Sequence, residues 1–326
     1  MKKLTFATVI LFLAMPLTVQ AQQAKPMARV GFLGSSTAEV DASRLAAFRR
    51  GLQELGYAEG KNIVIDQRYA AGKAEELPKL AAELLRLKVD VLLTEGTPAA
   101  HAAKAATVTI PIVMGNAGDP VGTGLVASLA RPGGNVTGLS DFSSDLVTKR
   151  LELLKSMDPS ISHVAVLLNP ANATNPLEFK RMQEVAPKLG VTLVAFEIRS
   201  AEEIDRAFEA IRKQRRGAVI LAGDALWGVH RERILALAAK HRLPALYPSR
   251  VHVDNGGLMT YGIANFDALF HRAATYVDKI LKGAKPGDLP IEQPTRYALV
   301  INQKTASALG LKIPPVLRLQ ADQVIE

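Results

Sequence analysis

The apolar run Val30-Gly31-Phe32-Leu33-Gly34 opens a pattern that returns later in the chain, beginning at Val164-Ala165-Val166-Leu167-Leu168-Asn169. Each run precedes a helix-like stretch that contains Phe, a basic residue and Arg, at Phe48-Arg49-Arg50 and at Phe179-Lys180-Arg181. Both stretches then reach a Leu-Gly pair, a common helix end. The chain thus contains two copies of one strand–helix unit.

The repeat continues through further short apolar runs. The matched pairs are 63–65 with 192–194, 89–93 with 218–221, and 110–113 with 243–246. Short apolar strands that alternate with amphipathic helices are typical of a parallel α/β sheet covered on both faces. A chain of 326 residues also exceeds the size that one hydrophobic core usually supports. The sequence therefore predicts an α/β protein with two lobes of one design and a ligand cleft between them.

Gly- and Pro-rich segments mark the places where the chain would pass between the lobes. One is 131–135, followed by a crossing strand at 136–140, and another is 255–262. With a third passage after a helix at 267–281, the pattern predicts three hinge crossings. The predicted boundaries are 28–138 plus 260–291 for the N-terminal lobe, and 139–259 plus 292–326 for the C-terminal lobe.

Residues 1–21 have the features of a secretory signal peptide. Lys2 and Lys3 precede an apolar run, and Val19-Gln20-Ala21 fits a small-x-small cleavage site. The alternative, an uncleaved membrane anchor, is disfavoured because the run is short and interrupted by Thr and Pro. The chain has no Cys, so we expect neither disulfides nor a lipid anchor. The mature protein is expected to be free in the periplasm.

The basic charge of the chain does not form a nucleic-acid-binding pattern. The net charge of +9 is dispersed, and its densest cluster, 212–216, ends a helical pattern where cations suit the helix dipole. Aromatic residues make up 5% of the chain and are not interleaved with this cluster, so the usual stacking signature is missing. We expect no nucleic-acid partner.

Signatures of catalysis, cofactor binding and metal binding are absent from the sequence. It has no G-x-S-x-G elbow, Cys nucleophile, H-E-x-x-H motif or P-loop, and its six His residues lack metal-ligand spacing. The run Gly122-Thr123-Gly124-Leu125-Val126-Ala127 matches the dinucleotide fingerprint G-x-G-x-x-A. It does not lie in the first strand-to-helix turn, where that fingerprint belongs. We expect no enzyme activity, no cofactor and no metal.

The predicted binding site follows from the strand ends. In open parallel sheets, ligands bind beyond the carboxyl ends of the strands, in the loops that lead into helices. The repeat pairs the loop Gly34-Ser35-Ser36-Thr37 with Asn169-Pro170-Ala171-Asn172, and Thr94-Glu95-Gly96-Thr97-Pro98 with Ala222-Gly223-Asp224. These four loops are expected to face one another across the cleft.

Polar residues in these loops have two possible roles each. Thr97 precedes Pro98, so it either caps the next helix or belongs to a helix amino end that attracts a carboxylate. Asp224 either caps a helix or pairs with a ligand cation such as an ammonium group. Ser35 and Ser36 either cap the first helix or donate hydrogen bonds to the same anion.

Several longer stretches carry a resemblance to a known family. They are 111–113, 118–122, 124–138, 149–154, 257–259, 261–262, 280–286 and 309–311. On these stretches the chain resembles the substrate-binding proteins of ABC transporters, in the group that includes tryptophan- and tyrosine-binding members. The run 124–138 is long enough to be specific. The resemblance implies the type I periplasmic-binding-protein fold, with two Rossmann-like lobes.

The resemblance also implies a function. It predicts capture of a small solute by lobe closure, an amino acid or a related zwitterion or organic acid, and delivery to the permease subunits of an ABC transporter in the inner membrane. We expect a monomer. The alternative is a periplasmic sensor that presents its ligand to a membrane signalling receptor. The predicted ligand-binding positions are Ser35, Ser36, Gly96, Thr97, Asp119, Ser140, Asn169, Asn172 and Asp224.

Overall fold

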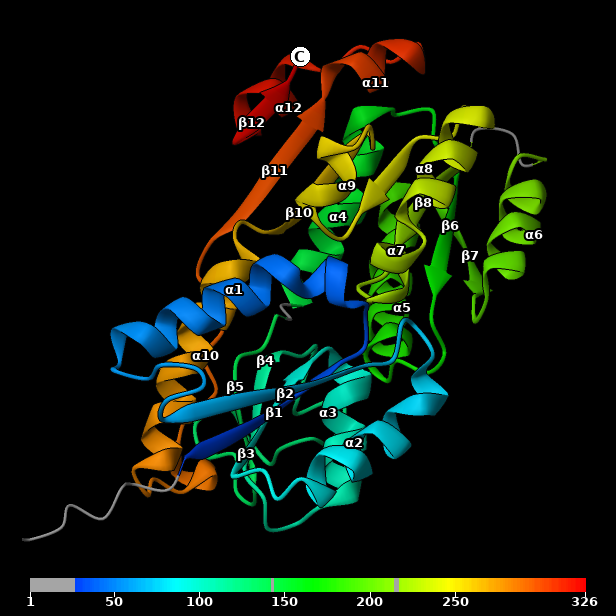
Figure 1. The fold of residues 1–326 in the computed structure, drawn as a ribbon. Coiled ribbons are helices and arrows are strands. Elements are labelled where there is room, and N and C mark those ends of the chain that lie inside the picture. Colours follow the sequence, from blue (N-terminus) through cyan, green and yellow to red (C-terminus); the bar gives the residue numbers. More distant parts are fainter. Residues whose placement is uncertain (1–26, 142–143, 214–216) are drawn as a thin grey trace, which may run out of the picture.

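The computed structural model describes residues 27–141, 144–213 and 217–326, which form two α/β lobes (Figure 1). The predicted signal peptide, 1–21, lies outside the described residues, as do residues 214–216 of the predicted basic cluster. Within the described ranges, the helices are all too short or too polar to cross a membrane.

The first lobe contains a parallel five-stranded sheet with the order β2-β1-β3-β4-β5. Its strands are β1 (Ala28–Gly34), β2 (Ile63–Tyr69), β3 (Val91–Glu95), β4 (Ile112–Asn116) and β5 (Val136–Gly138). Four helices cover the two faces: α1 (Ala38–Glu54) with α10 (Phe266–Leu281), and α2 (Leu77–Arg86) with α3 (Thr97–Ala106). An apolar core fills the space on each side of the sheet.

The second lobe contains a seven-stranded sheet with the order β12-β11-β10-β9-β8-β6-β7. Its strands are β6 (His163–Leu168), β7 (Thr192–Glu197), β8 (Gly217–Leu221), β9 (Ala245–Tyr247), β10 (Met259–Ile263), β11 (Tyr297–Asn302) and β12 (Gln323–Ile325). Neighbouring strands are parallel except β10 and β11. The α-helices of this lobe are α4 (Ser144–Met157), α5 (Thr174–Val185), α6 (Ala201–Ile211), α7 (Leu226–Val229), α8 (Arg231–Lys240), α9 (Arg250–Asp254), α11 (Gln303–Ala308) and α12 (Pro315–Gln320).

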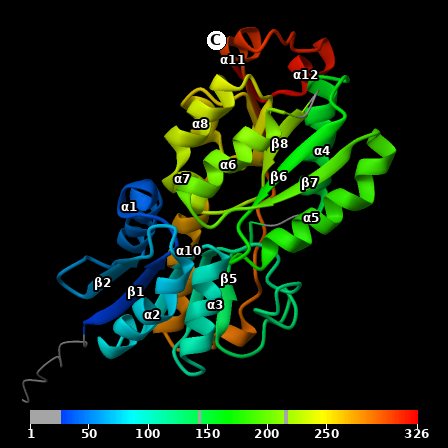
Figure 2. The ribbon, with the colours of Figure 1, turned by 90° about the vertical axis from the view of Figure 1, so that its right-hand side faces the viewer.

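The two lobes share one topology. Counted along the chain, the strands β2-β1-β3-β4-β5 of the first sheet correspond to β7-β6-β8-β9-β10 of the second. Figure 2 shows the two layered units one above the other, with helices on both faces of each sheet. The prediction of two parallel-sheet lobes of one design is therefore confirmed, and both sheets have the strand order of a doubly wound fold.

The chain passes between the lobes three times, and the crossing segments lie side by side. The N–H of Ser140 donates to the carbonyl oxygen of Glu292 at 2.9 Å, and the N–H of Ala264 donates to that of Arg296 at 3.3 Å. The first crossing follows β5, the second joins β10 to α10, and the third precedes β11. Three adjacent strands of this kind can bend together as a hinge.

One predicted boundary does not match the structure. The sequence predicts that residues 260–263 belong to the N-terminal lobe, but they lie in β10, which pairs with β9 and β11 in the second sheet. The Gly-rich segment at 255–257 precedes this strand, and the chain enters the first lobe only after Ile263. The glycines mark a turn inside the second lobe rather than the crossing itself.

Candidate functional site

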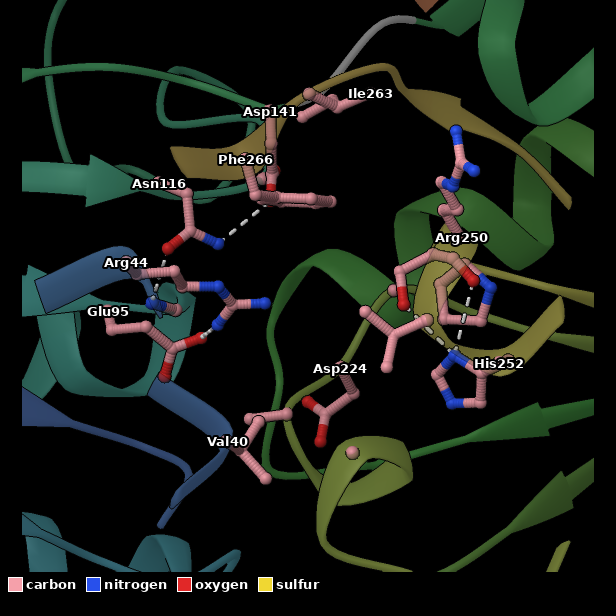
Figure 3. Close-up of a pocket in the computed structure, with 18 of the residues that line it drawn as sticks. Val40, Arg44, Glu95, Asn116, Asp141, Asp224, Arg250, His252, Ile263 and Phe266 are labelled. Carbon is pink, nitrogen blue, oxygen red and sulfur yellow. Dashed lines mark hydrogen bonds and ion pairs between the residues drawn. The ribbon is translucent and has the colours of Figure 1, made fainter. Parts of the chain in front are cut away.

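A cavity of about 350 Å³ lies between the two lobes. Its wall includes α1, the loops after β3 and β4, the loops after β6 and β8, and the segment around α9. Figure 3 shows side chains of both lobes arranged around this space, with Arg44 and Glu95 on one side and Arg250 and His252 opposite them. Of the four predicted loops, those after β3, β6 and β8 contribute to this wall, whereas the loop 34–37 after β1 does not.

Of the nine predicted positions, Gly96, Thr97, Asn172 and Asp224 line the cavity. Thr97 is the first residue of α3, but Gly96 is the capping position and no side chain caps this helix. The Thr97 hydroxyl instead accepts from the N–H of Gly118 at 2.9 Å and lies 3.1 Å from the hydroxyl of Thr174 in the other lobe. Thr97 therefore connects the lobes rather than capping α3 with its side chain.

Asp224 holds the start of a helix, which is one of the two roles considered for it, and its pairing with a ligand cation stays a prediction. Its carboxylate accepts from the N–H of Leu226 at 2.8 Å, which holds the start of α7, and it also lines the cavity. The side-chain amides of Asn169 and Asn172 donate to it at 3.0 and 2.8 Å. Burial raises the pKa of Asp224, and these donors oppose the shift. Asn169 is thus a support for Asp224 behind the cavity wall.

Ser35 and Ser36 lie outside the cavity wall, and neither caps α1. Thr37 is the cap of that helix, and its side chain accepts from the N–H of Val40. The Ser35 hydroxyl donates to the carbonyl oxygen of Glu95 at 2.8 Å, and the Ser35 N–H donates to the Glu95 carboxylate at 3.1 Å. Ser35 therefore positions Glu95. Ser36 is fully buried, and its hydroxyl has no hydrogen-bond partner among the described residues.

Asp119 and Ser140 also lie outside the wall of the cavity. The backbone of Asp119 has a φ of 22°, and its carboxylate accepts from the N–H of Gly122 at 2.8 Å. The same carboxylate pairs with Arg181 of the other lobe at 3.7 Å. Ser140 is fully buried in the first crossing segment. These two positions belong to the lobe interface and the hinge, respectively.

Arg44 is a cavity residue that the loop argument missed. It projects from α1, and its Nη1 lies 2.8 Å from Oδ1 of Asp41 and 2.9 Å from Oε1 of Glu95. Its guanidinium also stacks over the ring of Phe266, 5.1 Å from the centroid. Burial, together with the charge of Glu95, raises the pKa of Asp41 to about 8. The spacing of Asp41 and Arg44 in the first turns of α1 was the available signal.

The second lobe supplies two further buried ionisable side chains, Arg150 and Glu178. Arg150 of α4 donates through Nε to the carbonyl oxygen of Tyr261 at 2.8 Å and through Nη2 to that of Pro248 at 3.4 Å. Glu178 of α5 accepts from the N–H of Gly223 at 3.1 Å. Burial raises the pKa of Glu178 to about 7, although Arg150 opposes the shift. Both side chains line the cavity.

The lobes are in contact along the cleft. A methyl group on Gly118 would lie 2.5 Å from Cγ2 of Thr174, and one on Gly228 would lie 3.1 Å from Cγ1 of Val40. Each of these contacts joins one lobe to the other, as do the Thr97–Thr174 hydrogen bond and the Asp119–Arg181 pair. The cavity is therefore closed between the lobes.

Removing the Asp119–Arg181 pair should weaken ligand binding by at most about fivefold, since partly exposed ion pairs contribute about 0–1 kcal/mol. The Arg181 side chain is 40% exposed and its nitrogen is 3.7 Å from the carboxylate. Calorimetric titration of the Arg181→Ala variant measures the effect. A loss greater than tenfold would instead make this pair a principal contact of the closed state.

The ligand-free protein should lose stability as the pH rises from about 4.5 to about 7, because the pKa of Glu178 is raised to about 7 by burial. In this window the folded protein keeps a proton on Glu178 that the unfolded chain has released, so the free energy of unfolding falls as the pH rises. The groups that face Glu178 are Arg150, Asp141, Asp224 and the Gly223 N–H.

Thermal unfolding between pH 4.5 and pH 8 tests this expectation. The Glu178→Gln variant should show a smaller fall in Tm across this range than the wild type. The matched control is Glu184→Gln, on the exposed face of the same helix, which should keep the wild-type profile. Equal pH profiles for Glu178→Gln and the control would contradict the assignment.

The family model of ABC transporter substrate binding proteins matches residues 40–325. A curated relative, the tyrosine-binding protein of Clostridioides difficile (strain R20291), is 28% identical over 277 residues. The alignment covers 85% of this chain and 78% of the relative. The resemblance read from the sequence motifs is therefore confirmed.

Two solved structures distinguish the arrangement of the lobes. An ABC domain in complex with L-Trp from Streptococcus pneumonia matches with a TM-score of 0.84, at 26% identity, and the match covers 91% of this chain and 99% of that chain. A ligand-free, open substrate-binding protein with adhesive properties from Clostridium difficile has the same identity and coverage but a TM-score of 0.64.

The two solved structures have the same sequence identity to this chain and the same coverage. Their different TM-scores therefore reflect a difference in three-dimensional arrangement rather than in sequence similarity. The lobe arrangement of this chain is nearer to that of the L-Trp complex, in agreement with the contacts across the cleft. The cavity residues and both lobes except β1 and the first two residues of α1 fall within the region that the family model matches. The chain belongs to the family of ABC transporter substrate binding proteins.

Proposed function

We propose that the protein is a periplasmic receptor of an ABC importer, which captures an amino acid or a related small zwitterion by lobe closure and delivers it to a membrane permease. The observation that carries this proposal is the closed cavity of about 350 Å³, whose wall carries carboxylate and guanidinium groups from both lobes. Such a volume suits a small organic ligand, and charges of both signs suit a zwitterion.

The proposed orientation of the ligand follows from two of the predicted residues. The ammonium group would lie against Asp224, whose neighbours Asn169 and Asn172 hold the carboxylate in place. The ligand carboxylate would lie toward Thr97, because the amino end of α3 carries free N–H groups and a partial positive charge. The tyrosine-binding relative and the L-Trp complex support an amino acid as the ligand class.

The proposal includes the cellular setting. The protein acts as a monomer without catalysis, and residues 1–21 direct its export and are then removed. The mature chain from a periplasmic extract should begin at Gln22, which N-terminal sequencing measures. A chain that keeps residues 1–21 and fractionates with membranes would contradict this part.

The ligand class is tested by identifying the small molecule that the purified protein retains. The protein is denatured, and the released material is analysed by mass spectrometry. The proposal expects an amino acid or a related amine-bearing molecule in an amount near one per chain. A nucleotide cofactor in that amount would overturn it, and would direct attention to the Gly122–Ala127 run.

A further inference from the structure

The wall of the cavity carries more acidic than basic groups. Ten charged residues line it, six carboxylates and four guanidinium groups: Glu95, Asp141, Glu178, Asp224, Asp254 and Asp267 against Arg44, Arg150, Arg231 and Arg250. Arg250 and Asp254 are exposed at its rim, whereas charges on the less exposed groups of the wall are screened less by solvent than charges at the surface.

Two of the four guanidinium groups of the wall, those of Arg44 and Arg250, have carboxylate partners in the protein. Arg44 is shared by Asp41 and Glu95. Arg250 pairs with Asp254 of the same short helix at 3.2 Å. Arg150 donates to two carbonyl oxygens, and Nε of Arg231 has no hydrogen-bond partner among the described residues. Four acids of the wall therefore remain against two basic groups: Asp141, Glu178, Asp224 and Asp267 against Arg150 and Arg231.

Three cavity carboxylates receive only neutral donors. Asp141 accepts from the Asn116 amide at 3.0 Å, Glu178 accepts from the Gly223 N–H, and Asp224 accepts from two amides and one N–H. Within the described ranges, no Arg or Lys nitrogen lies within 4.0 Å of these three carboxylates. The structure therefore leaves these three carboxylates without an ion-pair partner; Glu178 is buried, and Asp141 and Asp224 are half-buried.

The three carboxylates are close enough to interact with one another. The charges of Asp141 and Asp224 both raise the pKa of Glu178, in addition to the larger effect of burial. In Figure 3, Asp141 and Asp224 lie on opposite sides of the same open space. A ligand in this space would be within reach of carboxylates on more than one side.

We propose that the ligand carries a net positive charge, as a basic amino acid or a small organic amine with two cationic groups does. A neutral zwitterion would place one ammonium among the acids but would add a carboxylate of its own, so the buried negative excess would remain. A second cationic group removes it. This inference rests on the proposed function, because it specifies the ligand of that same cavity.

The shape and lining of the cavity fit such a molecule. A volume of about 350 Å³ is on the scale of an organic ligand rather than of a single metal ion. Val40, Ile263 and Phe266 line it between the charged groups and supply an apolar wall for a chain of methylene groups.

Calorimetric titration with two matched amino acids tests the proposal. L-arginine and L-citrulline have nearly the same shape, but only the first has a cationic side chain; L-lysine and L-norleucine form a second pair. At pH 7.5, each cationic member should bind at least tenfold more tightly than its neutral partner. Equal or tighter binding of the neutral members would overturn the inference while leaving the amino-acid receptor intact.

A variant connects the preference to the cavity acids. Glu178→Gln should reduce the ratio of L-arginine to L-citrulline affinity by about fivefold or more, whereas Glu184→Gln, exposed on the same helix, should leave the ratio unchanged. Equal ratios in both variants would overturn the role of Glu178. If the folded protein bound neither the cationic nor the neutral amino acids, nor L-tryptophan and L-tyrosine, the proposed function itself would be wrong.

Discussion

Replacing Gly118 by Leu is expected to weaken ligand binding by about 100-fold or more while both lobes remain folded. A methyl group at this position would already lie 2.5 Å from Cγ2 of Thr174, in the other lobe. A larger side chain would hold the lobes apart, and ligand affinity falls in proportion to the population of the closed state. Calorimetric titration gives the affinity, and small-angle scattering gives the radius of gyration, which should rise toward that of an open form.

The matched control for Gly118→Leu is Ala130→Leu, which adds a similarly large apolar side chain at an exposed position of the same lobe. It should bind ligand as the wild type does. The combination of Gly118→Ala with Thr174→Ala should recover part of the affinity that Gly118→Ala loses, because it removes the atoms that the added methyl group meets. Wild-type affinity in Gly118→Leu would show that binding does not need the closed arrangement.

Replacing Asp224 by Ala is the second change with a large expected effect, a loss of affinity of about 100-fold for an ammonium-bearing ligand. Removing one partner of a buried charge pair costs about 3–5 kcal/mol, and 100-fold corresponds to about 2.7 kcal/mol. Thr97→Ala should cause a smaller loss, of about tenfold, because it removes a neutral hydrogen-bonding group and its contact with Thr174.

Asp224→Asn separates the charge from the packing. It keeps the shape of the side chain and one acceptor for the N–H of Leu226, so its Tm should stay closer to that of the wild type than the Tm of Asp224→Ala. Its affinity should nevertheless fall by tenfold or more. If Thr97→Ala and Asp224→Ala both bound ligand as the wild type does, the proposed orientation would be wrong.

The fold was predictable because the same local pattern occurs twice. The runs at Val30 and Val164 become β1 and β6. In the first sheet β1 lies between β2 and β3, and in the second sheet β6 lies between β7 and β8. The position of residues 260–263 was not predictable from glycine spacing alone. Whether a Gly-rich turn precedes a strand of the same lobe or a crossing depends on the pairing of β10 with β11, which is a tertiary contact.

The candidate site was predicted only in part, for a physical reason. Thr97 and Asp224 lie at the carboxyl ends of strands, where topology alone brings loops together. Arg44, Arg150 and Glu178 lie within helices, where a charged residue in a sequence normally indicates a solvent-facing surface. These side chains are covered by other elements around the cavity. The periodicity of a single helix gives no information about those tertiary contacts.

Asp119 is a predicted ligand-binding residue that lies outside the cavity wall. Its loop does follow β4 at a carboxyl end of the sheet, as predicted. The left-handed backbone and the hydrogen bond from Gly122 direct the carboxylate away from the cavity and toward Arg181. Loop position therefore identified the correct edge of the sheet, while the direction of each side chain depended on local turn geometry.

The central claim is that the two lobes close on a small ligand, and the distance between the lobes in solution tests it most directly. The chain has no Cys, so cysteines introduced at the exposed positions Val121 and Glu184, one in each lobe, would be the only labelling sites. Pulsed electron paramagnetic resonance between spin labels then measures the separation with and without the tightest-binding amino acid. The account predicts a shorter distance in the saturated sample, and an unchanged distance at saturation would contradict it.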